Sequence, residues 1–126
     1  MQDSHPIRVL IVDDHPMIRD GLTALLTGHA DMTVVAEAEN GEQALARYDA
    51  HHPDIVLMDL RMPVMDGLAA TRALLALDDT ARIIMLTTFE GDADIERALT
   101  AGARAFLLKD QLRTHLPTLI RDVFNR

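Results

Sequence analysis

The chain of 126 residues is 48% hydrophobic, contains no cysteine and carries a formal net charge of −8, which fits one globular domain without disulfides or thiolate chemistry. The acidic balance, with three phenylalanines and one tyrosine as the only aromatic residues, argues against direct contact with nucleic acid, which needs a basic face and stacking rings. Neither a long apolar run nor an export signal is present, so we expect a cytoplasmic protein without membrane contact.

The first half of the chain alternates between apolar runs and segments of helical periodicity. After a polar stretch at residues 1–6, which we expect to be loose, a β-branched run predicts a buried parallel strand at 7–12. This strand ends at Asp13-Asp14. The next elements are expected at 16–27 (helix), 32–36 (strand) and 42–50 (helix).

The second half of the chain continues this alternation. A short apolar run at 55–59 predicts a strand that ends in Asp59. Pro63 and Asp66-Gly67 then predict a turn that leads into the next helix. The remaining elements are expected as helices at 67–77, 92–101 and 111–125 and as strands at 81–86 and 105–108.

Polar residues, glycine and proline mark several of the expected helix ends. Asp92 or Asp94 can cap the helix that Gly102 closes, and we expect Asp110 to cap the last helix. Pro117 lies inside that last helix, which predicts either a kink or a late start of the helix.

Five strand–helix units with short connections predict an α/β fold. Right-handed crossovers between parallel strands place helices on both faces of the sheet, which makes a five-stranded, doubly wound parallel sheet with five helices. No linker, repeat or low-complexity segment interrupts this pattern, so we expect residues 1–126 to form one domain.

Polar residues stand where four of the five strands end. They are Asp13-Asp14, Asp59, Thr87-Thr88 and Lys109, the only lysine of the chain. The carboxyl ends of parallel strands lie at one edge, where open α/β sheets bind ligands, so these side chains are expected to meet. An isolated Asp59 would more often be a plain strand-end carboxylate, but the agreement of four strands favours a functional site.

The clustered residues suit phosphoryl transfer to a carboxylate. Three neighbouring carboxylates repel one another unless a cation joins them, and all-oxygen ligands favour Mg²⁺ or Mn²⁺. Asp59 would attack, Asp13 and Asp14 would hold the metal, Lys109 would neutralise the transferred group, and Thr87 would donate a hydrogen bond to it. An acidic patch without an ion, or a plain salt bridge to Lys109, remains an alternative.

Several motifs at matching spacing extend this interpretation: Val12-Asp13-Asp14, Asp59 followed by Met62-Pro63 and Asp66-Gly67, then Thr87 and Lys109. Over essentially its whole length, the chain resembles the receiver domains of bacterial two-component response regulators, in particular the NarL/FixJ (LuxR-type) branch. This resemblance implies a flavodoxin-like (CheY-like) fold with strand order 2-1-3-4-5. It also implies that Asp59 accepts a phosphoryl group from a sensor histidine kinase.

The resemblance also implies roles for individual residues. Asp14, Asp59 and the backbone carbonyl of Arg61 would bind Mg²⁺, with Asp13 acting through water. Thr87 and Phe106 would form a switch pair, in which the ring turns inward once the Thr87 hydroxyl has moved toward the phosphoryl group.

Some positions depart from the family's pattern. Phe106 stands where Tyr is common, and Val64 stands where Gly is frequent. Asp110 replaces a common Pro, which leaves the isomer of the Lys109–Asp110 peptide bond open. The residues that flank the site are Arg61, Thr88 and Phe89. The long cation of Arg61 and the ring of Phe89 should shield the phosphoryl group, so we expect slow autodephosphorylation.

The expected output surface comprises the fourth helix, the fifth strand and the fifth helix, while the first and fifth helices are an alternative dimer face. We expect a homodimer after phosphorylation. LuxR-type receivers normally precede a helix-turn-helix domain, which would lie beyond residue 126 and make the contacts with DNA. A stand-alone receiver is the alternative. The chain is expected to be a phosphoacceptor and not an enzyme. The alternatives are a non-phosphorylated interaction module and an aspartyl-phosphate phosphatase, which would usually carry Asp where this chain has Arg61.

Overall fold

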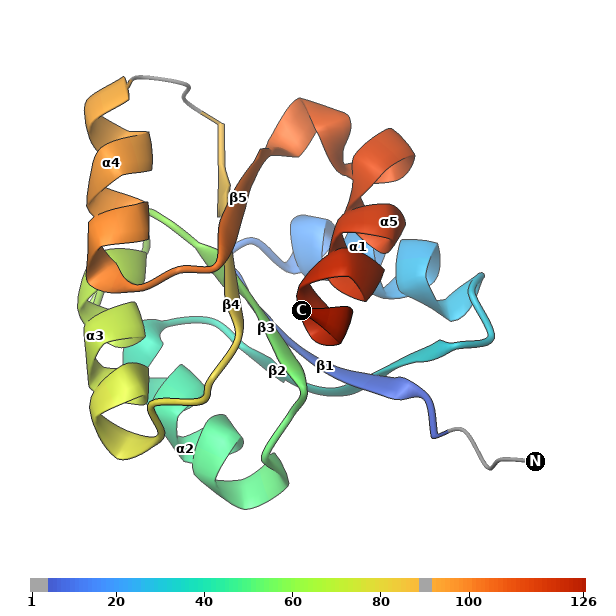
Figure 1. The fold of residues 1–126 in the computed structure, drawn as a ribbon, viewed down its shortest axis with the longest axis horizontal. Helices are drawn as coiled ribbons and strands as arrows, with labels where there is room; N and C mark the ends of the chain where they lie inside the picture. Colours follow the sequence, from blue (N-terminus) through green and yellow to red (C-terminus); the bar gives the residue numbers. More distant parts are fainter. Residues whose placement is uncertain (1–4, 89–91) are drawn as a thin grey trace.

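The computed structural model describes residues 5–88 and 92–126 and contains one five-stranded parallel sheet between two layers of helices (Figure 1). The strands are β1 (Ile7–Val12), β2 (Met32–Ala38), β3 (Ile55–Asp59), β4 (Ile83–Thr87) and β5 (Ala105–Leu108). The helices are α1 (Pro16–Thr27), α2 (Gly41–His51), α3 (Gly67–Leu77), α4 (Asp92–Ala101) and α5 (Leu112–Asn125), with a short 3₁₀ turn at Lys109–Gln111. The strand order β2-β1-β3-β4-β5 confirms the expected topology.

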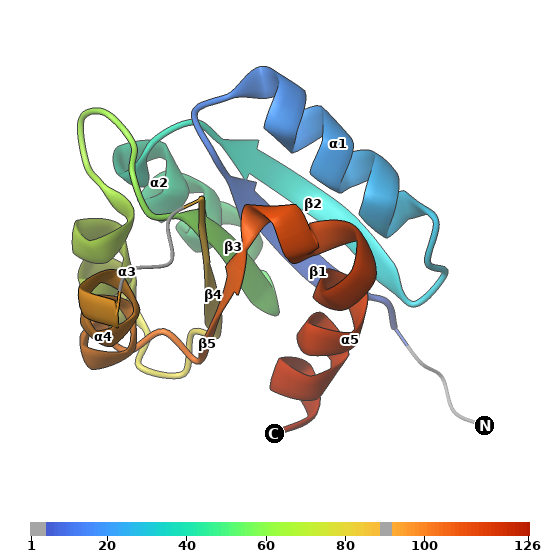
Figure 2. The ribbon, with the colours of Figure 1, turned by 90° about the horizontal axis from the view of Figure 1, so that it is seen from above.

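The helices cover the two faces of the sheet in two groups. α1 and α5 pack on one face and α2, α3 and α4 on the other, as Figure 2 shows from above. Val9 and Ile11 belong to the apolar core under α1 and α5, whereas Leu10 and Val12 belong to the core on the opposite face. Because both faces are buried, the central strands β3 and β4 read as continuous apolar runs rather than as alternating ones.

Two strands differ from their expected bounds. β2 extends to Ala38, since its last residues pair with the end of β1, where the Asp13 amide donates to the Ala38 carbonyl. β4 begins at Ile83 rather than at 81. The Ala81 amide donates to the Asp78 carbonyl, so this residue still belongs to the turn after α3.

The expected cap at Asp110 is wrong. Asp110 lies in the 3₁₀ turn, and α5 begins two residues later, with Gln111 at its N-cap and no side-chain capping bond. The helix starts at Leu112 with Pro117 inside it, which excludes the late start and leaves the kink as a prediction. The peptide bond between Lys109 and Asp110 is trans.

The C-terminal end of α4 agrees with expectation. Gly102 closes the helix with φ 111°, its amide donates to the Leu99 carbonyl, and the Ala103 amide donates to the Ala98 carbonyl. Asp94 lies inside the helix and therefore does not cap it. The side chain of Asp92 and residues 1–4 of the expected loose terminus fall outside what the structure describes.

Candidate functional site

The polar strand ends meet at one edge of the sheet, as expected. Asp59 is the last residue of β3 and pairs with Leu86, while Thr87, the last residue of β4, pairs with Leu108. Lys109 directly follows β5, and Asp13 directly follows β1. Asp13, Asp59 and Thr87 are all buried. The register of the sheet therefore gathers residues that lie up to 96 positions apart in the chain.

Lys109 joins two carboxylates at the centre of this edge. Its Nζ atom donates to Asp13 Oδ2 at 2.8 Å and lies 3.1 Å from Asp59 Oδ1. The Asp13 side chain is fully buried, and only 11% of the Lys109 side chain is exposed. A buried ammonium held between two carboxylates offers a fixed positive charge beside Asp59.

Burial and charge act in opposite directions on the ionisation of these groups. Burial, followed by the charge of Asp13, raises the pKa of Asp59 to about 6, although Lys109 opposes this effect. Burial alone would lower the pKa of Lys109, but its hydrogen bond to Asp13 and the charge of Asp59 outweigh burial and raise that pKa. The lysine is thus held in its charged form.

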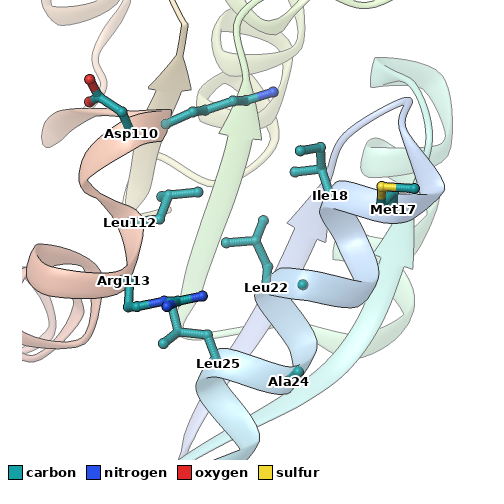
Figure 3. Close-up of a pocket in the computed structure, with 10 residues that line it drawn as sticks. Met17, Ile18, Leu22, Ala24, Leu25, Asp110, Leu112 and Arg113 are labelled. Atoms are coloured by element: carbon teal, nitrogen blue, oxygen red, sulfur yellow. The ribbon is translucent and has the colours of Figure 1, made fainter.

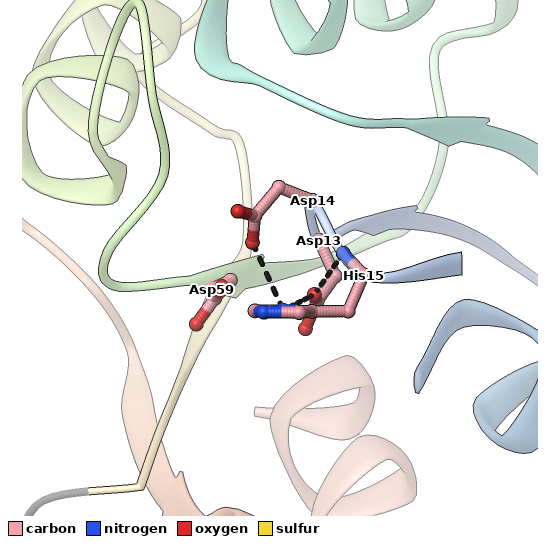
Figure 4. A group of neighbouring side chains, drawn as sticks. All are labelled: Asp13, Asp14, His15 and Asp59. Carbon is pink, nitrogen blue, oxygen red and sulfur yellow. Dashed lines mark hydrogen bonds and ion pairs between the residues drawn. The ribbon is translucent and has the colours of Figure 1, made fainter. Parts of the chain in front are cut away.

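His15 adds a ring nitrogen to the acidic cluster (Figure 4). Its Nδ1 lies 3.0 Å from Asp13 Oδ1 and 3.0 Å from Asp14 Oδ1, and its backbone amide donates to Asp13 Oδ1 at 2.8 Å. The contact to Asp14 lacks hydrogen-bond geometry, so the buried Asp14 Oδ1 atom has no hydrogen-bond partner among the described residues. An oxygen left in this way is costly unless a cation meets it.

The donor set fits a hard divalent cation. Asp13, Asp14, His15 and Asp59 each offer one ligand atom, and these atoms all lie within 4.8 Å of one another. Carboxylate oxygens are the ligands that Mg²⁺ prefers, and the Asp14 oxygen that accepts no hydrogen bond lies in this cluster beside the His15 ring.

The remaining residues predicted from the sequence lie on the loops and the strand around the site. Arg61 lies in the loop after β3, but its guanidinium pairs with Asp94 of α4 at 3.1 Å. Thr88 follows β4 and is exposed, whereas Phe89 falls outside the described residues. Phe106 is half-buried on β5, where it pairs with Met85 and packs against the core under α2, α3 and α4.

Three contacts at the site could not be found from the sequence. The pairing of Arg61 with Asp94 depends on where α4 packs, and the bond from Arg19 Nη1 to the Asp13 carbonyl (2.6 Å) depends on the orientation of α1. The approach of His15 to two carboxylates depends on one side-chain rotamer. Only the Asp94 and Arg97 pair, three residues apart on one helix, leaves a signal in the sequence.

A pocket of about 600 Å³ lies beside the site between α1 and α5 (Figure 3). Ile18, Leu22 and Leu25 line it from α1, and Leu112 and Arg113 line it from α5, with Lys109 at its edge. Met17 on its rim is 84% exposed.

No helix within residues 5–88 and 92–126 is long and apolar enough to cross a membrane.

Comparison with known proteins agrees with this geometry. The chain is 39% identical over 110 residues to the nitrate/nitrite response regulator NarL of Escherichia coli K12. The aligned segment covers 87% of this chain and 51% of NarL. It superposes on the signal receiver domain of the putative response regulator NarL from Mycobacterium tuberculosis with a TM-score of 0.91 and 36% identity, covering 96% of this chain and 98% of that one.

A third similarity is to a CheX–CheY–BeF₃–Mg²⁺ complex from Borrelia burgdorferi, with a TM-score of 0.89 and 31% identity, covering 95% of this chain and 90% of that one. The chain spans about half the length of the curated relatives it matches. The family model of the response regulator receiver domain matches residues 9–121. The chain therefore belongs to the receiver domains of two-component response regulators, of the NarL/LuxR type.

Proposed function

We propose that Asp59 accepts a phosphoryl group from the phosphohistidine of a sensor histidine kinase. The observation that carries this proposal is the Lys109 ammonium, fixed between Asp13 and Asp59 at the strand ends. Phosphoryl transfer needs an acceptor in place and positive charge on the oxygens of the transferred group, and little else from the protein. The buried site supplies both without a general base, because a carboxylate with a pKa of about 6 is mostly ionised at neutral pH.

In the transfer, an Asp59 carboxylate oxygen forms a bond to phosphorus while the bond from phosphorus to the donor's imidazole nitrogen breaks. The electron pair of the broken bond stays on that nitrogen. No proton has to leave Asp59, because its carboxylate is already ionised. Lys109 neutralises the negative charge of the transferred group, and Asp13 holds Lys109 in position. Thr87 lies at the end of the neighbouring strand, and its hydroxyl donates a hydrogen bond to a phosphoryl oxygen.

Asp14, Asp59 and the backbone carbonyl of Arg61 would hold Mg²⁺, with Asp13 acting through water and Mn²⁺ as an alternative cation. When bound, the cation neutralises charge on the acceptor and on the transferred group. The unpartnered Asp14 oxygen supports this assignment, and the related CheX–CheY complex contains Mg²⁺ together with BeF₃. The carboxylates already lie close together without a phosphodonor, so their mutual repulsion favours the binding of a cation.

The test uses acetyl phosphate with Mg²⁺ and mass spectrometry of the intact chain. We expect a mass gain of one phosphoryl group in the wild type and in Asp79→Asn, a control that removes an exposed carboxylate remote from the site. Asp59→Asn should abolish the gain, and EDTA should suppress it. A gain that survives Asp59→Asn would contradict the proposal, and no gain from either acetyl phosphate or kinases would favour a non-phosphorylated interaction module.

The same proposal extends to the response of the domain once Asp59 is phosphorylated. The Thr87 hydroxyl moves toward the phosphoryl group and the half-buried Phe106 ring turns inward, which changes the surface of α4, β5 and α5 and promotes homodimer formation. Relatives of about twice this length are named transcriptional regulatory proteins, which supports assigning any DNA binding to a segment other than the receiver domain. The chain itself acts in the cytoplasm as a phosphoacceptor that loses its phosphoryl group slowly, and not as an enzyme.

A further inference from the structure

Asp94 is a nearly buried carboxylate on α4 with two arginine partners. Its side chain is 7% exposed, its Oδ2 lies 3.1 Å from Arg61 Nη2, and its Oδ1 lies 3.1 Å from Arg97 Nη1. The two arginine side chains are 72% and 60% exposed. The carboxylate is therefore the fixed member of this group, and the two guanidinium groups are the members that are free to move.

The two ion pairs differ in what they connect. Arg97 stands three residues after Asp94 on the same helix, so its pair stays within α4. Arg61 stands two residues after Asp59 in the loop between β3 and α3, so its pair ties the acceptor loop to α4. Of these two pairs, the Arg61 pair is therefore the one that can pass a change on α4 to the surroundings of Asp59.

Arg61 has room to leave this pair. A pocket of about 330 Å³ lies against it, lined by Leu60, Arg61, Met62, Asp66, Leu68, Asp94 and Arg97. A guanidinium binds phosphoryl oxygens through a planar pair of donors as well as it binds a carboxylate.

We propose that Asp94 is a positioning residue that holds Arg61 away from Asp59 and thereby limits how readily the site takes an anionic phosphodonor. Arg97 shares the same carboxylate and so weakens this hold. The inference rests on the proposed phosphorylation of Asp59 and adds a regulatory contact to that site. It makes the reactivity of Asp59 depend on the position of α4.

Three substitutions alter the hold in different ways. Asp94→Asn removes the charge that retains Arg61, so Arg61 becomes free to meet the phosphoryl group. Arg97→Gln leaves Arg61 as the only cation on Asp94, which strengthens the hold. Arg61→Gln removes the cation that is held, whereas Arg61→Lys keeps a positive charge at the same place.

The experiment measures the rate of phosphorylation by sub-saturating acetyl phosphate with Mg²⁺ at matched ionic strength. We expect Asp94→Asn to raise this rate roughly three- to tenfold, the range for gaining one partly screened charge-assisted contact. Arg97→Gln should lower it roughly twofold. In the Arg61→Gln background, Asp94→Asn should leave the phosphorylation rate unchanged. In the Arg61→Lys background, Asp94→Asn should again raise the rate, by less than in the wild type.

A merely structural role for Asp94 would give a different pattern. Asp94→Asn would then lower the rate with or without Arg61, so its effect would persist in the Arg61→Gln background. That result overturns the inference, and so does a rate that Arg97→Gln raises or leaves unchanged, which keeps the inference testable if Asp94→Asn fails to fold. A wild type that gains no phosphate would instead refute the proposed function, whereas normal wild-type phosphorylation with these patterns absent would refute only the role of Asp94.

Discussion

Gly67 is the residue where the first turn of α3 approaches the end of β3 most closely. A Cβ atom at this position would lie 2.2 Å from the Asp59 carbonyl oxygen and 3.0 Å from Leu60 Cα. The Gly67 amide also donates to the Leu60 carbonyl at 2.9 Å. A side chain here would push apart the strand end that carries the acceptor and the helix that follows it.

We therefore expect Gly67→Ala to lower the free energy of unfolding by about 3 kcal/mol, the upper range for overpacking against backbone. Gly21 provides a matched control, because a Cβ atom there would meet nothing within 4 Å on the exposed side of α1. Gly21→Ala should raise stability by about 0.5–1 kcal/mol through helix propensity. Urea unfolding measures both, and effects of the same sign would contradict the expectation.

Tyr48 gives a second residue-scale prediction, because it is the only tyrosine in a chain without tryptophan. Its hydroxyl donates to Asp78 Oδ2 at 2.8 Å. Burial, and after it the contact with Asp78, raises the pKa of Tyr48 above its ordinary range. Since the folded state holds the proton more tightly than the unfolded state, this contribution to stability is complete below the ordinary pKa of about 10 and is lost as pH rises above it.

The ultraviolet absorbance of phenolate reports this group alone. We expect no phenolate signal in the folded chain at a pH where free tyrosine is already ionised. Asp78→Asn should lower the pKa of Tyr48, because it removes a negative charge while keeping an acceptor oxygen, and Asp79→Asn next to it should not. Ionisation of the wild type at the ordinary pKa while the fold persists would rule out this account.

At the scale of elements, the loop from β3 to α3 contains an unfavourable backbone conformation. Val64 has φ 69°, and the Met65 amide donates to the Pro63 carbonyl at 2.7 Å, which together describe a γ-turn centred on a β-branched residue. Val64 is 77% exposed, so its side chain contributes little packing. The strain of a left-handed β-branched residue therefore has no evident compensation within the loop.

Val64→Gly should accordingly raise the free energy of unfolding by about 1 kcal/mol, because relief of strain exceeds the extra entropy of glycine in the unfolded chain. Val64→Ala keeps a Cβ atom at positive φ and should recover less of this gain. Thermal unfolding of the three chains compares them directly. If glycine proves no better than alanine at this position, the loop is not strained in the way that its geometry indicates.

The elements differ in how well they could be predicted from sequence. The bounds of some are set by their own residues, and the bounds of others by contacts with elements elsewhere in the chain. β1, α3 and β5 follow from their own apolar runs and turn residues, and their bounds agree with expectation. β2 reaches Ala38 because β1 pairs with it, and α5 begins at Leu112 because the 3₁₀ turn at Lys109–Gln111 precedes it. Contacts made by other elements decide these ends, and a single run of residues does not record them.

The candidate site shows the same division at the scale of the whole molecule. Asp13, Asp59, Thr87 and Lys109 could be brought together from sequence, because parallel strands share an edge and each residue ends a strand. The pairing of Arg61 with Asp94 could not, since it depends on how α4 sits against the loop after β3. Sheet topology therefore predicts which residues lie together at the site. Helix packing decides which residues near the site already form ion pairs with other elements.

Stability of the whole molecule should depend on Mg²⁺, because the proposed ligands come from the ends of β1 and β3 and from the loop beyond. A ligand that binds only the folded state stabilises it by about 2.7 kcal/mol at a hundredfold excess over its dissociation constant. Without metal, Asp14→Asn should be more stable than the wild type, since it removes a carboxylate with an unpartnered oxygen from an acidic cluster.

With Mg²⁺ the order should reverse, because the wild type gains the binding energy and Asp14→Asn loses most of it. Thermal unfolding in EDTA and in millimolar Mg²⁺ measures this reversal, with sodium chloride matching the ionic strength and Asp79→Asn as a variant of equal charge that keeps the site. An equal upward shift in all three chains would mean that Mg²⁺ acts on the net charge of −8 and not at the cluster. A reversal confined to Asp14→Asn would place the cation between β1 and β3, at the position that the proposed phosphorylation of Asp59 assigns to it.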